Sequence, residues 1–368
     1  MVLKRPSWPS GRLVTLEVGS KLLADNPLGD PHVRELDVWL PPGYDEGARA
    51  GLGKRYPVLF VLAGYTGSGK SHTAWKSFDE NVPERAARLI AARKMPPCIL
   101  VFPDCFTAYG GNQYVNSAGV GRYADHLTRE LVPLVDREFR TLADRRHRGC
   151  FGKSSGGYGA LVHAMKHTRY WGAVASHSGD AYFDVAYRCD WPATLDELSK
   201  YRAKPRREGR VDSSADFATP SGGIDDGRIR RFLEAVWRKP NPTSAEVHCL
   251  MYIGMAATYD PDPKEPRRVR VPFDLETGEL IEARWRRWLR HDPIHLVARF
   301  AKNLNTLRGL FIDCGWRDQY RLHYGARILS RRLHEHGVEH VHEEFDGTHS
   351  GIDHRMDKSM PFLLRALA

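Results

Sequence analysis

The sequence predicts an α/β protein with a mostly parallel central sheet, flanking helices and one inserted segment. Short apolar runs alternate with longer stretches of helical periodicity in the first half of the chain, and the alternation returns near the C-terminus. Such alternation is typical of a parallel sheet. A stretch rich in Pro, Arg, Asp and Ser, 184–298, interrupts it. We therefore expect a core in two parts, 1–183 and 299–368, with 184–298 as a lid or cap.

The expected strands are apolar runs bounded by turn-forming residues. Two runs near the N-terminus, 13–18 and 33–40, come first, and Pro41-Pro42-Gly43 ends the second. The run 56–63 is nearly all apolar, as expected of a strand buried on both faces of a sheet. The other expected strands are 98–102, 148–151, 172–176, 307–313 and 340–345.

The expected helices lie between these strands. Apolar residues recur at helical spacing in 82–93, 122–139, 155–167 and 320–336. A helix between two strands provides the crossover that parallel neighbours need. The order of elements therefore agrees with the predicted class.

Composition limits the classes of function. The chain has 368 residues, 42% of them apolar and 27% charged, which is enough for a buried core. We find neither a signal-peptide apolar region nor a membrane span, so we expect a cytoplasmic protein with no membrane partner. The net charge of +10 is carried by arginine clusters at 202–210, 267–270 and 284–290, interleaved with acids. This pattern favours a solvated surface over a nucleic-acid partner, and a homo-oligomer remains an open alternative.

Six cysteines are scattered without CxxC spacing, so neither a dense disulfide framework nor a zinc site is expected. The histidines at 334, 336, 340 and 342 are interpreted as a helix end and alternate strand positions rather than metal ligands. We expect neither a metal nor an organic cofactor.

A candidate nucleophile lies where a strand meets a helix. Gly152-Lys153-Ser154-Ser155-Gly156 has the pattern G-x-S-x-G, in which the glycines allow a tight turn that exposes the central serine. This context favours Ser154 as a nucleophile over an ordinary Gly/Ser turn. Ser155 is the neighbouring candidate.

A serine nucleophile needs a general base and a group that orients the base. With this kind of turn the acid and then the histidine follow later in the chain, each in a loop after a strand. Asp318 follows the strand 307–313, and His349 follows the strand 340–345. The order Ser154, Asp318, His349 therefore fits, and Asp313 is the rival acid.

The turn after the strand 56–63 supports two hypotheses. With the N–H of Ser155, an N–H from this turn should form an oxyanion hole, and Tyr65 is preferred to Thr66. The turn also matches G-x-x-x-x-G-K-[ST] from Gly64 to Ser71, which indicates a nucleotide-binding P-loop. We prefer the first hypothesis because it accounts for three separate sites, whereas the P-loop accounts for one.

The inserted segment is expected to cover the nucleophile, because both of its ends attach at the carboxyl end of the sheet, where ligands bind in such folds. We predict that Trp285 and Trp288 of the segment, together with Trp316, contact a small-molecule ester substrate. Trp191 and Trp237 either line the cleft or hold the segment on the core.

At these motifs the chain resembles the esterase D-like family of α/β-hydrolases, which includes S-formylglutathione hydrolases, feruloyl esterases, enterochelin esterases and antigen 85 mycolyltransferases. The matching stretches are 40–44, 56–67, 152–160, 313–318 and 347–349, within 12–182 and 300–368. Lys153 replaces the family's usual His or Leu, and Ser155 its usual Met.

The resemblance implies an α/β-hydrolase fold and carboxylester hydrolysis through an acyl-enzyme, with Ser154 as nucleophile, His349 as base and Asp318 as orienting acid. An acyltransferase with the same triad, a P-loop protein and a noncatalytic binding protein are the alternatives.

Overall fold

The computed structural model describes residues 8–46, 53–203 and 226–368. Its main feature is an eight-stranded sheet in the order β1-β2-β4-β3-β7-β8-β9-β10. The strands β1 and β2 pair antiparallel, β2 and β4 also pair antiparallel, and every later pair is parallel. The predicted class, a mostly parallel sheet flanked by helices, is confirmed. The strands are β1 (Arg12–Gly19), β2 (Val33–Leu40), β3 (Val58–Leu62), β4 (Ile99–Pro103), β7 (Arg148–Lys153), β8 (Ala173–His177), β9 (Gly309–Gly315) and β10 (Val341–Phe345).

The central strand β3 shows why the apolar runs form buried strands. Successive side chains of a strand point to opposite faces. Val58, Phe60 and Leu62 pack into the core on one face of the sheet, and Leu59 and Val61 pack into the core on the other. All five are buried, so the strand needs apolar residues at every position.

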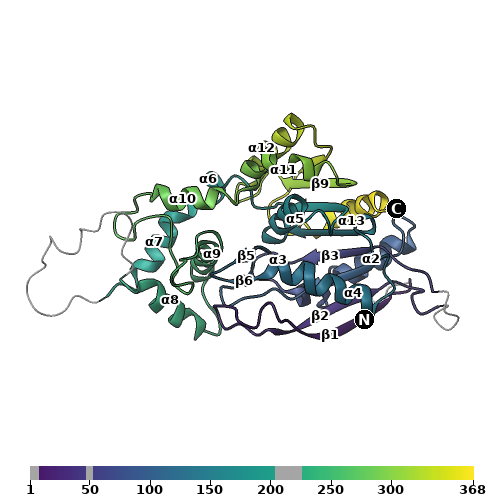
Figure 1. The fold of residues 1–368 in the computed structure, drawn as a ribbon, viewed down its shortest axis with the longest axis horizontal. Helices are drawn as coiled ribbons and strands as arrows, with labels where there is room; N and C mark the ends of the chain where they lie inside the picture. Colours follow the sequence, from purple (N-terminus) through teal and green to yellow (C-terminus); the bar gives the residue numbers. More distant parts are fainter. Residues whose placement is uncertain (1–7, 47–52, 204–225) are drawn as a thin grey trace, which may run out of the picture.

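Helices cover both faces (Figure 1). One face is covered by α3 (Tyr123–Asp125), α4 (Val132–Glu138), α5 (Ser155–Lys166), α11 (Pro293–Leu304) and α12 (Leu322–Glu335). The other face is covered by α2 (Val82–Ala91) and α13 (Met356–Ala366). The helix α13 was not expected from the sequence. The short elements are α1 (Gly69–Thr73), β5 (Asn116–Ser117) and β6 (Gly121–Arg122). None of the helices in the described part of the chain has the length and apolar character to cross a bilayer.

The helix expected at 122–139 contains a π-helical stretch, His126–Leu131, between α3 and α4. Glu130 in this stretch accepts hydrogen bonds from the backbone N–H groups of Lys21 and Leu22, at 2.9 and 3.0 Å, and lies 2.7 Å from Nδ1 of His126. Burial raises the pKa of Glu130, but the hydrogen bonds from His126, Ser20 and Leu22 outweigh it and lower the pKa to about 2. This carboxylate therefore ties the loop after β1 to the helical layer.

The inserted segment forms a helical lobe beside the sheet (Figure 1). Its two ends meet at Asp292, whose carboxylate accepts hydrogen bonds from the N–H groups of Tyr182 and Phe183, at 3.0 and 2.7 Å. The next helix, α11, already packs on α5, so we place the return to the core at Pro293. The helices of the lobe are α6 (Phe183–Ala186), α7 (Trp191–Ser199), α8 (Arg228–Trp237), α9 (Ser244–Tyr259) and α10 (Glu282–Leu289). Most of the arginine cluster 202–210 lies outside the described residues.

Candidate active site

The turn between β7 and α5 places Ser154 in a strained backbone conformation, with φ 57° and ψ −125°. A non-glycine residue at positive φ is uncommon and marks a position held by its surroundings. A Cβ atom at Gly152 would lie 2.5 Å from the carbonyl oxygen of Leu62, and one at Gly156 would lie 2.1 Å from the same oxygen. Both glycines are therefore required because the turn packs directly on β3.

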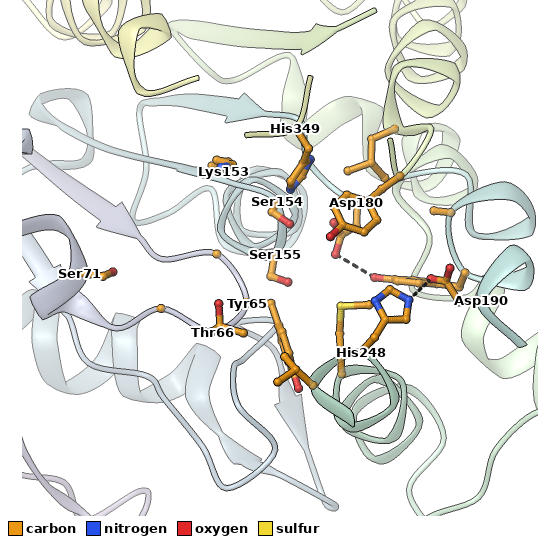
Figure 2. A pocket seen from close by; sticks show the side chains of 18 of the residues that line it. Tyr65, Thr66, Ser71, Lys153, Ser154, Ser155, Asp180, Asp190, His248 and His349 are labelled. Carbon is orange, nitrogen blue, oxygen red and sulfur yellow. Dashed lines mark hydrogen bonds and ion pairs between the residues drawn. The ribbon is translucent and has the colours of Figure 1, made fainter. Parts of the chain in front are cut away.

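His349 and Asp318 lie together above this turn. Nδ1 of His349 is 2.8 Å from Oδ2 of Asp318, and both residues are buried. Burial raises the pKa of Asp318, but hydrogen bonds from His349 and from the backbone N–H of Tyr320 outweigh it, so the pKa lies below its ordinary value. Figure 2 shows the His349 ring directed at the Ser154 hydroxyl. The structure therefore brings together the three side chains predicted from the order of the loops.

The rival acid, Asp313, has other partners. Its carboxylate lies 2.6 Å from Nδ1 of His177 and accepts a hydrogen bond of 2.7 Å from Nε of Arg355. Nε2 of His177 is in turn 2.9 Å from Oγ of Ser359. Asp313, His177 and Ser359 have exposed fractions of 0%, 2% and 0%. Asp313 therefore belongs to a sealed network inside the core and does not orient His349.

Two backbone N–H groups lie where an oxyanion hole is expected. Ser155 is the first residue of α5, so its N–H has no partner within the helix. The N–H of Thr66 donates to the carbonyl of Gly110 at 2.8 Å and is not available. In the described part of the chain, the N–H of Tyr65 makes no such bond. This arrangement favours Tyr65 over Thr66, in line with the sequence analysis.

The stretch from Gly64 to Ser71 does not form a phosphate cradle. Nζ of Lys70 lies 3.1 Å from carboxylate oxygens of both Glu35 and Asp37. A P-loop lysine instead points into the loop toward the phosphates. The match to the P-loop pattern is therefore a coincidence of composition, and the P-loop interpretation is wrong.

A cavity of about 490 Å³ joins Ser154, Ser155 and His349 to residues of the inserted segment. The segment lines it with Ala186, Tyr187, Asp190, Ser244, Val247, His248 and Met251. Other walls come from the turn after β3 and from Lys153, Asp180 and Tyr320. The segment thus forms one side of the cavity that holds Ser154.

Several polar side chains of this cavity were not predicted from the sequence. Oδ2 of Asp180 accepts hydrogen bonds from the Tyr187 hydroxyl at 2.8 Å and from Nε2 of Gln113 at 3.4 Å. Nε2 of His248 lies 3.0 Å from Oδ2 of Asp190. Asp180 could have been found, because it follows the strand that ends at His177, on the edge of the sheet where ligands bind. His248 sits on a helix and gives no comparable signal.

The tryptophans predicted to contact substrate lie elsewhere. Trp285 and Trp288 have exposed fractions of 3% and 0%, and they pack against each other with ring centroids 5.6 Å apart. Trp288 also packs against Tyr187 and Tyr259, beneath the cavity wall. Trp316 is exposed under the guanidinium of Arg317 and does not line the cavity. This expectation was wrong for Trp285 and Trp288 because their rings fill the interior of the lobe, and for Trp316 because its ring lies at the surface outside the cavity.

Comparison with known proteins gives the family. The family model named Esterase matches residues 31–357. Esterase Rv1288 of Mycobacterium tuberculosis is 31% identical over 218 residues, which are 57% of this chain and 44% of that protein. The endo-1,4-beta-xylanase/feruloyl esterase of Xylanibacter ruminicola is 30% identical over 162 residues, 41% of this chain and 20% of that protein. The chain thus spans less than half the length of these curated relatives.

Solved structures show the same fold. A ferulic acid esterase aligns with a TM-score of 0.59 at 19% identity, over 98% of this chain and 100% of that chain. The S-formylglutathione hydrolase FrmB of Staphylococcus aureus aligns with a TM-score of 0.54 at 15% identity, over 96% of this chain and 98% of that chain. The family match over residues 31–357 and these alignments lead to one conclusion: the chain belongs to the Esterase family and has the α/β-hydrolase fold.

Proposed function

We propose that the protein is a serine carboxylesterase in which Ser154 is the nucleophile, His349 the general base and Asp318 the acid that orients the base. One observation carries this proposal. Ser154, in a strained backbone conformation directly after β7, lines the same cavity as His349, whose Nδ1 lies 2.8 Å from Oδ2 of Asp318. With the Nδ1 proton directed at Asp318, Nε2 is free to accept a proton.

The proposed reaction has two halves. Oγ of Ser154 attacks the ester carbonyl carbon while Nε2 of His349 takes its proton, and the N–H groups of Tyr65 and Ser155 stabilise the negative oxygen. The C–O bond to the alcohol then breaks, and His349 returns the proton to the leaving oxygen. A water molecule that gives its proton to His349 attacks the acyl-enzyme, and the acid leaves with Ser154 restored.

Two chemical classes of ester are the first substrates to test. Relatives in sequence and fold are named feruloyl esterase and S-formylglutathione hydrolase, so aryl-acyl oxygen esters and small thioesters are natural members of a panel. A cavity of about 490 Å³ has room for a substrate of this size.

The test is a panel of p-nitrophenyl esters together with covalent labelling by a fluorophosphonate. We expect the wild type to hydrolyse at least one ester and to be labelled once, at Ser154. Ser154→Ala should lower kcat on the order of 10⁶-fold and abolish labelling. Ser155→Ala is the matched control, because it keeps the backbone N–H, and it should still be labelled at Ser154. Labelling that is lost in Ser155→Ala and kept in Ser154→Ala would refute the assignment.

Product analysis with added alcohol separates hydrolysis from acyl transfer.

A further inference from the structure

The cavity beside Ser154 has two ends of different character. Figure 2 shows Lys153 and Ser71 on one side of Ser154, and Asp180, Asp190 and His248 on the other. The ester bond must lie between them, near Ser154. The two ends therefore meet the groups on opposite sides of that bond.

Lys153 places an ammonium group at the first end without a carboxylate to neutralise it. Among the described residues, Nζ of Lys153 has no ion pair within 4.0 Å and no hydrogen bond. The acid that lines this end, Asp353, lies 2.6 Å from Nζ of Lys76 and is thereby paired. Burial lowers the pKa of Lys153, and the charge of Lys76 lowers it further, while Asp353 and Asp318 act in the opposite direction. A partly buried cation without a partner is costly unless a ligand supplies the missing anion.

His72 adds a second polar group to the same end. Its Nε2 is buried and has no hydrogen-bond partner among the described residues. Burial lowers the pKa of His72 to about 4, so the ring is neutral at pH 7. A neutral imidazole whose Nε2 carries the proton can donate one hydrogen bond to an anion held by Lys153.

The opposite end does not favour an anion. His248 there is paired with Asp190 at 3.0 Å. Asp180 already accepts from Tyr187 and Gln113 through Oδ2, and it adds a carboxyl group to this wall. An ester with an anionic group on one side would therefore bind with that group toward Lys153 and away from the carboxyl groups of Asp180 and Asp190.

We propose that Lys153 and His72 form a subsite for an anionic group, in the first place a carboxylate, on one side of the ester that the enzyme cleaves. The inference rests on the proposed function, because it names a substrate class for the same cavity. In this proposal Lys153 is a specificity-determining residue, at a position where the esterase D-like family usually has His or Leu.

The experiment compares matched esters that differ in one negative charge. Mono-p-nitrophenyl glutarate and p-nitrophenyl pentanoate place the charge on the acyl side. The acetates of 4-hydroxybenzoic acid and of its methyl ester place it on the alcohol side. The quantity measured is kcat/KM for the anionic ester divided by kcat/KM for its neutral partner, which cancels any change in the amount of folded enzyme.

We expect the wild type to favour the anionic member of one pair. Lys153→Met should lower that ratio about tenfold or more, equivalent to about 1.4 kcal/mol. Lys153→Arg should retain most of the preference, and added salt should weaken it in the wild type because the charge interaction is screened. Lys302→Met, an exposed change on α11, is the matched control and should leave both ratios at the wild-type values.

The two proposals fail in different ways. If neutral esters are hydrolysed with Ser154 labelled, but Lys153→Met leaves both ratios unchanged, the anion subsite is refuted and the esterase assignment stands. If the wild type neither hydrolyses any ester nor reacts with the fluorophosphonate, the proposed function is refuted and the subsite with it.

Discussion

Changing Asp318 and Asp313 to asparagine, one at a time, should separate a loss of catalysis from a loss of stability. In Asp318→Asn the amide keeps the size of the side chain but removes the acceptor that holds the Nδ1 proton of His349. The ring then favours the tautomer with the proton on Nε2, which cannot accept a proton from Ser154. We expect kcat to fall about 10⁴-fold, equivalent to about 5.4 kcal/mol of transition-state stabilisation.

Asp313→Asn should act on stability instead. The substitution removes the charge that faces Arg355 and His177, whose side chains are 8% and 2% exposed. Breaking a buried ion pair costs about 3–5 kcal/mol. An unfolding entropy of about 2.1 cal/mol/K per residue gives about 0.8 kcal/mol/K for 368 residues, so Tm should fall by about 4–6 °C.

Both variants are measured with the same neutral p-nitrophenyl ester and by differential scanning calorimetry. Asp318→Asn should lower the Tm less than Asp313→Asn does, because Asp318 has one ionic partner, His349, whereas Asp313 has two, His177 and Arg355. If Asp313→Asn lost as much kcat as Asp318→Asn at an unchanged Tm, our reasoning about the two acids would be wrong.

Three further results are expected. Gly156→Ala should unfold the turn or abolish fluorophosphonate labelling, because the new Cβ would lie 2.1 Å from the backbone oxygen of Leu62; normal labelling at normal Tm would contradict this close approach. The pKa of Glu130 is lowered to about 2, so its contribution to stability is complete above about pH 4.5 and is lost as pH falls toward 2. Urea unfolding should therefore show a larger stability difference between wild type and Glu130→Gln at pH 6 than at pH 3.5, and an equal difference would argue against this shift. Lys70→Ala should cost less than about 1 kcal/mol, since the Lys70 side chain is half exposed and the buried Asp37 keeps hydrogen bonds from the hydroxyls of Thr15 and Thr73. Calorimetry should detect no ATP binding in either form, and binding by the wild type alone would restore the P-loop interpretation.

The tight turn at Ser154 could be predicted from the sequence because its geometry imposes a local pattern. The glycines around Ser154 are forced by backbone contacts with β3, so the constraint is visible in consecutive letters. The apolar runs of the sheet are equally visible, because strands buried on both faces require apolar residues at each position. These two constraints together were enough for the fold class.

Features decided by distant contacts were not predictable in the same way. Asp313 and Asp318 are both acids at the end of one strand, and only their partners His177 and His349 distinguish them. A tryptophan in a polar segment has the same pattern whether it fills a core or lines a cavity, so Trp288 was assigned to the wrong one. The helix α13 does carry apolar residues at helical spacing, but Pro361 within it obscured the pattern.

The sealed network of Ser359, His177 and Asp313 has a practical consequence. These are the residue types of a hydrolytic triad, joined by contacts of 2.9 and 2.6 Å, yet no substrate reaches them. A search by residue identity and spacing alone would return this network alongside the proposed triad of Ser154, His349 and Asp318. Any template used to find serine hydrolases by geometry must therefore also require an open cavity and backbone N–H donors beside the serine, and the sealed network of this chain is a test case for that requirement.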